Sequence, residues 1–189
     1  PPRSTLFPYT TLFRSSVKDL KKIIFDAKKR KAKRKKLNYL DSDKDAPLKG
    51  RFLIQMFEKS STRTRLSFYL AIRQLGGGAL NLRKDELHFG EGGESIHDTA
   101  KILSNYGDIF MFRTDSDKKL QEFKKYIKIP IINGLSPLSH PTQILSDIFT
   151  IEEIKKKSIH NLNICWIGDS NNVLNSLIEA SVKDRKSVV

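Results

Sequence analysis

The segment Ser60-Ser-Thr-Arg-Thr-Arg65 brings hydroxyl and guanidinium groups together where a predicted strand gives way to a predicted helix. The apolar run at 51–57 predicts the strand, and apolar residues at helical spacing up to residue 74 predict the helix. The first N–H groups of a helix lack intrahelical partners and carry the positive end of its dipole, so they attract an oxyanion. Arg63 and Arg65 add planar, permanently charged groups that suit phosphate. The pattern favours a phosphate site, and an ordinary Ser/Thr cap beside two solvent-facing arginines is the alternative.

Polar side chains also follow the other predicted strands. Arg113 ends one strand, His140 to Gln143 follow the next after a short loop, and Gly168-Asp-Ser-Asn-Asn172 follows the last. Ligands of α/β sheets bind beyond the carboxyl ends of the strands, so we expect these groups to converge on one anionic ligand. The imidazole and amide of His-Pro-Thr-Gln suit a polarised carbonyl. Arg113 as a solvent-facing strand end, and His140 as a capping residue, are the alternatives.

Strand-like and helix-like patterns alternate along the chain, which implies parallel βαβ units and a doubly wound α/β sheet. Gly76-Gly-Gly78 follows a helix instead of a strand, so it is not a dinucleotide-binding fingerprint. The expected strands cover 51–57, 79–82, 108–113, 129–132 and 162–167. The expected helices cover 18–36, about 62–74, 94–106, 118–126, 141–154 and 171–182.

The net charge of +14 is concentrated in one predicted helix. Eleven Lys or Arg residues lie between Lys18 and Lys36, against Asp19 and Asp26. Aromatic residues do not interleave with them, as a single-strand binding surface would require. We therefore expect a solvated basic face and no specific nucleic-acid partner, with a basic nucleic-acid-binding α/β module as the competing hypothesis. The face expected to pack inward consists of Val17, Leu20, Ile23, Ile24 and Ala27.

The composition is that of a water-soluble protein. No apolar run approaches the length of a membrane helix, and the first residues lack a signal-peptide pattern, so we expect a cytoplasmic protein without a membrane partner. The single Cys165 agrees with a reducing compartment. His88, His97 and His160 lack metal-ligand spacing with Cys or acidic residues, so no metal site is predicted.

In these motifs the chain resembles the carbamoyltransferases, and more narrowly the ornithine carbamoyltransferases. Ser-Thr-Arg-Thr-Arg and His-Pro-Thr-Gln are shared with aspartate carbamoyltransferases, whereas Gly168-Asp-Ser-Asn-Asn172 is similar to the ornithine branch. The matching segments are 57–65, 93–100, 112–113, 140–151 and 166–176.

The resemblance implies transfer of a carbamoyl group from carbamoyl phosphate to the side-chain amine of L-ornithine, with no metal or redox cofactor. Arg63, Arg113 and His140 are the implied catalytic residues. Arg113, His140 and Gln143 are implied to contact the carbonyl side of carbamoyl phosphate, and Asn172, with Asn171, the amino acid. His88 stands where the family usually has Gln. The residues implied to hold the phosphate are Ser61, Thr62, Arg63 and Thr64.

The resemblance also implies an organisation of the chain. We expect a carbamoyl phosphate-binding domain at 16–150 and the first strand and helix of a truncated ornithine-binding domain at 151–183. Residues 1–15 and 184–189 read like translated adapter sequence, so we expect them to be non-native. The loop at 90–94 is one residue longer than usual for the family.

The full-length family enzyme is implied to be a homotrimer. Because the family's later ornithine-binding segments are missing, we expect this polypeptide to bind carbamoyl phosphate weakly and not to turn over. Carbamoyltransferases for putrescine or aspartate are the neighbouring alternatives.

Overall fold

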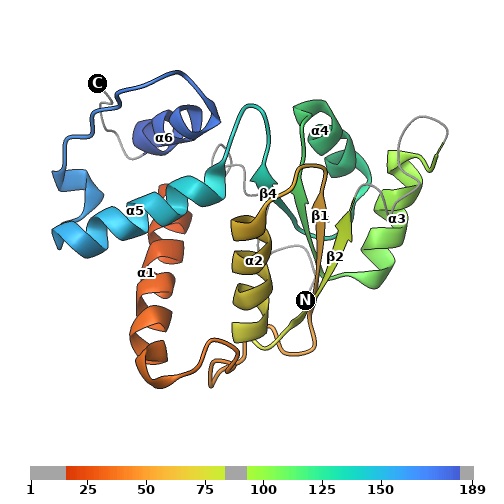
Figure 1. Cartoon of the computed structure of the whole chain (residues 1–189), viewed down its shortest axis with the longest axis horizontal. Coiled ribbons are helices and arrows are strands. Elements are labelled where there is room, and N and C mark those ends of the chain that lie inside the picture. The colour runs from red at the N-terminus through yellow and green to blue at the C-terminus, as the bar shows by residue number, and fades with distance from the viewer. Residues whose placement is uncertain (1–15, 84–92, 184–189) are drawn as a thin grey trace.

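A computed structural model of the chain describes residues 16–83 and 93–183. Four strands form one parallel sheet in the order β2-β1-β3-β4 (Figure 1). β1 (Phe52–Phe57) pairs with β2 (Gly78–Arg83) on one side and with β3 (Ile109–Arg113) on the other, and β3 pairs with β4 (Ile131–Leu135). The predicted parallel α/β sheet is therefore confirmed.

Helices cover both faces of the sheet, as a doubly wound fold requires. On one face, side chains of α3 (Ile96–Tyr106) and α4 (Asp117–Tyr126) pack on the side chains of β1 and β3 that point to that face, such as Ile54 and Phe110. On the other face, α2 (Thr62–Gln74) packs on the alternate positions of the same strands. Because both faces of β1 are covered, its residues from Leu53 to Phe57 are all buried, which explains why they are apolar except for Gln55.

Three helices form a second apolar cluster beside the sheet. α1 (Val17–Lys33), followed by the 3-10 turn η1 (Arg34–Lys36), packs with α5 (Pro141–Lys155) and α6 (Asn172–Lys183). Ile24 is buried and the other expected inward residues of α1 are half-buried, so the predicted amphipathic face is confirmed. Among the described helices, none combines the length and apolarity that a membrane crossing requires.

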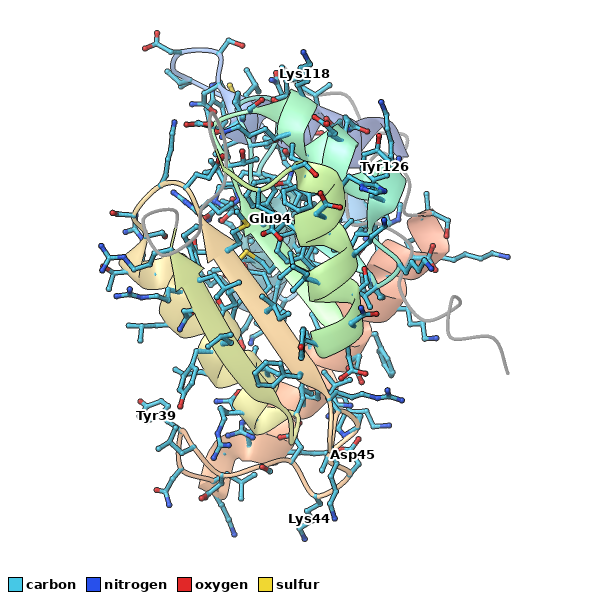
Figure 2. All side chains as sticks on the ribbon, turned by 90° about the vertical axis from the view of Figure 1, so that its right-hand side faces the viewer. Tyr39, Lys44, Asp45, Glu94, Lys118 and Tyr126 are labelled. Carbon is cyan, nitrogen blue, oxygen red and sulfur yellow. The ribbon has the colours of Figure 1, made fainter. Side chains whose placement is uncertain are left out.

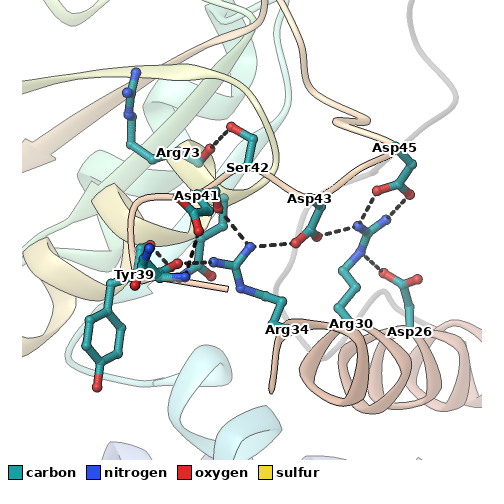
Figure 3. A network of polar contacts seen from close by, with 11 residues as sticks. Asp26, Arg30, Arg34, Tyr39, Asp41, Ser42, Asp43, Asp45 and Arg73 are labelled. Atoms are coloured by element: carbon teal, nitrogen blue, oxygen red, sulfur yellow. Dashed lines mark hydrogen bonds and ion pairs between the residues drawn. The ribbon is translucent and has the colours of Figure 1, made fainter. Parts of the chain in front are cut away.

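Ion pairs hold the basic helix α1 in place (Figure 3). Arg30 and Arg34 both donate to Asp43, at 2.7 and 2.6 Å, and Arg30 also contacts Asp26 and Asp45. On its other side, α1 is tied to α5 by lysine–glutamate pairs at 2.7 Å, Lys28 with Glu152 and Lys31 with Glu153. Part of the positive charge of α1 is therefore balanced within the molecule.

The glycine triplet ends α2 and lets β2 begin. Gly76 has a φ of +90°, which favours glycine, and a Cβ there would lie 2.8 Å from the Cβ of Ala46. At Gly77 a Cβ would lie 2.8 Å from the carbonyl oxygen of Arg51. Gly76 thus allows α2 to end, and Gly77 allows the chain to pass close to the backbone of Arg51.

Two strand predictions need correction. The segment 162–167 joins no strand of the sheet; the structure gives it extended backbone with a single bridge at Ile164. It is amphipathic in sequence, but a strand needs a neighbour for its N–H and C=O groups, and here Ile164 and Trp166 pack against the helical cluster instead. The fourth strand runs over 131–135 instead of 129–132, because it continues through Asn133 and Gly134, which the apolar pattern did not include. A Cβ at Gly134 would clash with Sδ of Met111.

Candidate anion-binding site at the carboxyl edge of the sheet

The candidate site lies where the chain changes direction across the sheet. From β1 the chain passes through α2 to β2 on one side, whereas from β3 it passes through α4 to β4 on the other. β1 and β3 are neighbours in register, with Phe57 opposite Arg113, so the residues that follow them lie side by side. Such a switch point is the usual ligand-binding position in an open α/β sheet.

Figure 2 shows the two ends of the sheet. Lys118, in the first turn of α4, lies at the carboxyl end, and the connector that carries Tyr39, Lys44 and Asp45 lies at the opposite end. The ion pairs of that connector are therefore remote from the candidate site.

The N-terminus of α2 forms one wall of the site. Ser61 is its N-cap, with extended backbone and a hydroxyl that accepts the N–H of Thr64 at 3.2 Å. The N–H groups of Thr62 and Arg63 fall in the first turn, where a helix offers no internal acceptor. The Arg63 side chain is exposed and has no hydrogen bond or ion pair with another described residue. Backbone donors without an acceptor inside the helix and an exposed cation thus meet at the positive end of a helix dipole.

Arg113 forms the second wall. Its Nη1 donates to Oγ1 of Thr64 at 3.2 Å, which joins the end of β3 to the first turn of α2. Its Nε is buried and unpartnered, and among the described residues no carboxylate pairs with this guanidinium. Burial lowers the pKa of Arg113, which marks the cost of holding the charge there. A half-buried cation without an anion is costly for folding and is typical of a functional site.

His140 approaches the same edge from the start of α5. It is the N-cap residue, followed by Pro141 at the first helical position, and its side chain makes no capping bond. Burial, followed by the positive charge of Arg113, holds the pKa of His140 below its usual value, and Asp147 acts in the opposite direction. A neutral imidazole at physiological pH donates one ring N–H without adding charge. Gln143, in the first turn of α5, is exposed and donates to Asp147 Oδ1 at 2.8 Å.

The loop before His140 is held by α6. Asn172 Nδ2 donates to the carbonyl oxygen of Ser136 at 2.9 Å, and Asn175 Nδ2 to that of Leu138 at 3.1 Å. The buried hydroxyl of Ser176 accepts the N–H of His140 at 2.8 Å. Three side chains of one helix thus fix a five-residue loop that ends at His140.

The two asparagines named from sequence have structural bonds here. Asn171 Oδ1 caps α6 by accepting the N–H groups of Val173 and Leu174, at 2.9 and 3.1 Å. Asn172 holds the loop, as described above. Their expected contact with an amino acid stays a prediction. His88, the remaining residue named from sequence, lies outside the described residues.

Sequence reasoning missed Glu58, the residue directly after β1. Its side chain is fully buried, and it accepts hydrogen bonds from Thr114 Oγ1 and from Lys119 Nζ, the latter at 2.6 Å. A charged residue that closes a run of five buried residues is a signal that could have found it, because a carboxylate there must have partners.

Within the described part of the chain, no three His, Cys, Asp or Glu side chains gather as a metal site requires. The chemistry available at this edge is instead that of fixed donors. Helix N–H groups, hydroxyls, guanidinium groups and an imidazole can bind an oxyanion and stabilise negative charge that develops beside it.

A parallel α/β sheet whose switch point carries hydrogen-bond donors suited to an anion defines a phosphate-binding α/β domain. Residues 9–153 match the family model described as aspartate/ornithine carbamoyltransferase, carbamoyl-P binding domain. The chain therefore belongs to this family, which confirms the resemblance stated from its motifs.

Its relatives include ornithine carbamoyltransferases. That of Rhizorhabdus wittichii is 48% identical over 138 residues, which cover 73% of this chain and 44% of the relative. That of Rhizobium meliloti is 45% identical over 165 residues, covering 87% and 52%. The solved ornithine carbamoyltransferase of Burkholderia thailandensis superposes with a TM-score of 0.86 at 34% identity, covering 97% of this chain and 61% of that one. The chain spans about half the length of the curated relatives it matches.

Proposed function

We propose that the chain binds carbamoyl phosphate at the carboxyl edge of its sheet, for transfer of the carbamoyl group to the side-chain amine of L-ornithine. The observation that carries the proposal is the half-buried guanidinium of Arg113, which pairs with no carboxylate of the described residues and is hydrogen-bonded to Thr64 in the first turn of α2. The family match and the names of the relatives support this donor and this acceptor.

In the proposed complex the phosphate group lies at the N-terminus of α2. Ser61, Thr62 and Thr64 offer hydroxyl and N–H groups, and Arg63 adds a mobile charge. Arg113, His140 and Gln143 then face the carbonyl oxygen. Gln143 has to leave Asp147 to do so, which requires only a rotation of its exposed side chain.

The transfer itself is an acyl substitution. The uncharged amine of ornithine attacks the carbamoyl carbon, a C–N bond forms, and the C–O bond to phosphate breaks with its electron pair leaving on phosphate. The amine loses a proton, which the departing phosphate can accept, and the product is L-citrulline. Negative charge develops on the carbonyl oxygen, where loss of one fixed donor typically costs about 2.7–4 kcal/mol of barrier. Holding both substrates together lowers the barrier further.

The acceptor is the finer part of the proposal. The names of the relatives favour ornithine over putrescine or aspartate, and Asn171 and Asn172 are the residues offered to it. From the resemblance of the motifs we also propose that the full-length protein is a homotrimer, to be checked by light scattering, and that it is cytoplasmic.

Calorimetric titration of the purified chain with carbamoyl phosphate tests the donor site. We expect saturable binding that Arg63→Ala weakens by about tenfold or more, since a hydrogen bond to a charged group contributes about 1.5–3 kcal/mol. Arg73→Ala removes the same charge from the far end of α2 and should change the affinity less than about twofold.

Two outcomes would contradict the proposal. One is equal loss in both arginine variants, which would indicate general charge attraction. The other is displacement of carbamoyl phosphate by a single-stranded oligonucleotide at moderate salt, which would favour the nucleic-acid hypothesis.

A further inference from the structure

Glu58 joins the two loops that build the anion site. It follows β1 directly and is the first residue of the loop 58–61 that leads to α2. Its Oε2 accepts from the hydroxyl of Thr114 and from the N–H of Asp115 at 3.4 Å, both in the loop that follows β3. Its Oε1 accepts from Lys119 Nζ at 2.6 Å, in the first turn of α4. One buried carboxylate thus contacts three successive parts of the neighbouring β–α connection.

The main chain around Arg113 is fixed on both sides by this arrangement. The N–H of Glu58 donates to the carbonyl oxygen of Arg113 at 2.9 Å, and the Glu58 side chain holds the next residue, Thr114. The N–H of Thr114 in turn donates to the carbonyl oxygen of Leu135, at the end of β4. The backbone from which the Arg113 side chain extends therefore has little freedom.

The Glu58–Lys119 ion pair is not expected to contribute much to the stability of the fold. A buried ion pair costs so much desolvation that apolar replacements are often as stable. Burial lowers the pKa of Lys119, and the bond to Glu58 and the charges of Glu58 and Asp115 outweigh that effect and raise it. Both charged groups have hydrogen-bond partners. Compared with apolar residues in the same place, the pair fixes the geometry between the ends of two strands.

We propose that Glu58 is a positioning residue, which sets the Arg113 guanidinium against the N-terminus of α2 and so sets the affinity for the phosphate group without touching it. The inference rests on the proposed function, because it needs Arg113 to contact the anion. It predicts that Glu58 acts through Arg113 and through no other part of the site.

A double-mutant cycle on the 189-residue chain tests this, with the affinity for carbamoyl phosphate as the readout. Glu58→Ala should weaken binding by about tenfold, within the range usual for residues that orient a ligand-binding group. In the Arg113→Ala background the same change should alter the affinity less than about twofold, since coupled residues are not additive. An equal loss in both backgrounds would show a general structural role and overturn the proposal.

Two further variants keep the test decisive if Glu58→Ala folds poorly by circular dichroism. Thr114→Val keeps the Glu58–Lys119 pair and breaks the link beside Arg113, so it should reproduce the loss. Glu58→Gln retains an acceptor oxygen for Thr114 and should restore most of the affinity. Unchanged affinity in Thr114→Val would overturn the proposal.

Asp115→Asn is the matched control. Its carboxylate also approaches Lys119, at 3.6 Å, but is far more exposed than that of Glu58. We expect its affinity to stay within about twofold of the parent chain. Failure of the proposed function looks different, since the parent chain would then show no saturable binding, or Arg113→Ala would leave the affinity unchanged.

Discussion

At the scale of single residues, the site depends on the positive charge of Arg113, which forms no ion pair with a carboxylate in the described ranges 16–83 and 93–183. Arg113 is half-buried, and the carboxylate of Glu58, whose N–H donates to the Arg113 carbonyl oxygen across the sheet, is directed to Thr114 and Lys119 instead. The same charge lowers the pKa of His140. Burial of this charge is unfavourable for folding, and a bound phosphate would offset it.

The coupling of Arg113 to His140 gives a prediction for Arg113→Ala. Removing the guanidinium should raise the pKa of His140, while burial, the larger cause, keeps it below its ordinary value of about 6.5. NMR titration of the ring protons measures this, with the remote His160 as a reference. An unchanged or lower pKa in the variant would contradict the proximity of the two groups.

The sign of the effect on stability follows from the same pKa. A histidine that is harder to protonate when folded adds stability above its unfolded pKa, and this stability is lost as the pH falls from that value to the folded pKa. Arg113→Ala should therefore lessen the acid sensitivity that His140 contributes.

At the scale of elements, α6 and the loop before His140 act as one unit. Ser176 is buried, accepts the N–H of His140 and donates to the carbonyl oxygen of Asn172. The loop itself is filled by a buried polar cluster in which Asn133 Nδ2 donates to the hydroxyls of Ser136 and Ser139, at 3.2 and 2.9 Å. The position of the imidazole is thus set from two sides.

Ser176→Ala tests this unit. The variant leaves the N–H of His140 without its acceptor, and we expect a loss of about 1–3 kcal/mol in the free energy of unfolding. Urea unfolding measures it. Ser146→Ala is the control, because Ser146 is exposed and its hydroxyl bonds only within α5, to the carbonyl oxygen of Thr142. Equal losses in the two variants would count against a special role for Ser176.

Helices and strands could be predicted where the apolar pattern within one segment is enough to identify them, as for α2, α4 and the central strands. The segment 162–167 was not, because its apolar pattern cannot tell whether a partner strand lies beside it. The site residues could be predicted because they follow the predicted strands. The hydrogen bonds of Asn172 and Glu58 could not. Their partners, Ser136 and Thr114, are far away in sequence and are brought close only by the sheet.

At the scale of the whole molecule, two of the positive charges of the basic helix α1 are used to hold the fold together. Arg30 and Arg34 of α1 converge on Asp43, whose side chain is only 9% exposed. The N–H of Asp43 also donates to the carbonyl oxygen of Gln74, at the end of α2. This aspartate therefore fastens the basic helix to the sheet domain.

Asp43→Asn should accordingly lower the free energy of unfolding by about 1.5–3 kcal/mol, because two charged hydrogen bonds lose their anion. Asp26→Asn removes an exposed pair on the same Arg30 and should cost about 0.3–0.5 kcal/mol. Thermal or denaturant unfolding compares them. The prediction is wrong if Asp26→Asn is as damaging as Asp43→Asn.

Because α6 fixes the His140 loop, the parts of the site can form only in a certain order during synthesis. Chains emerge from the ribosome N-terminus first, and folding begins before synthesis ends. The parts of the anion site formed by α2 and Arg113 need residues up to Leu135, whose carbonyl oxygen accepts the N–H of Thr114, whereas the loop of His140 waits for Ser176. A nascent chain therefore gains the means to hold the anion before it gains the imidazole that would act on it.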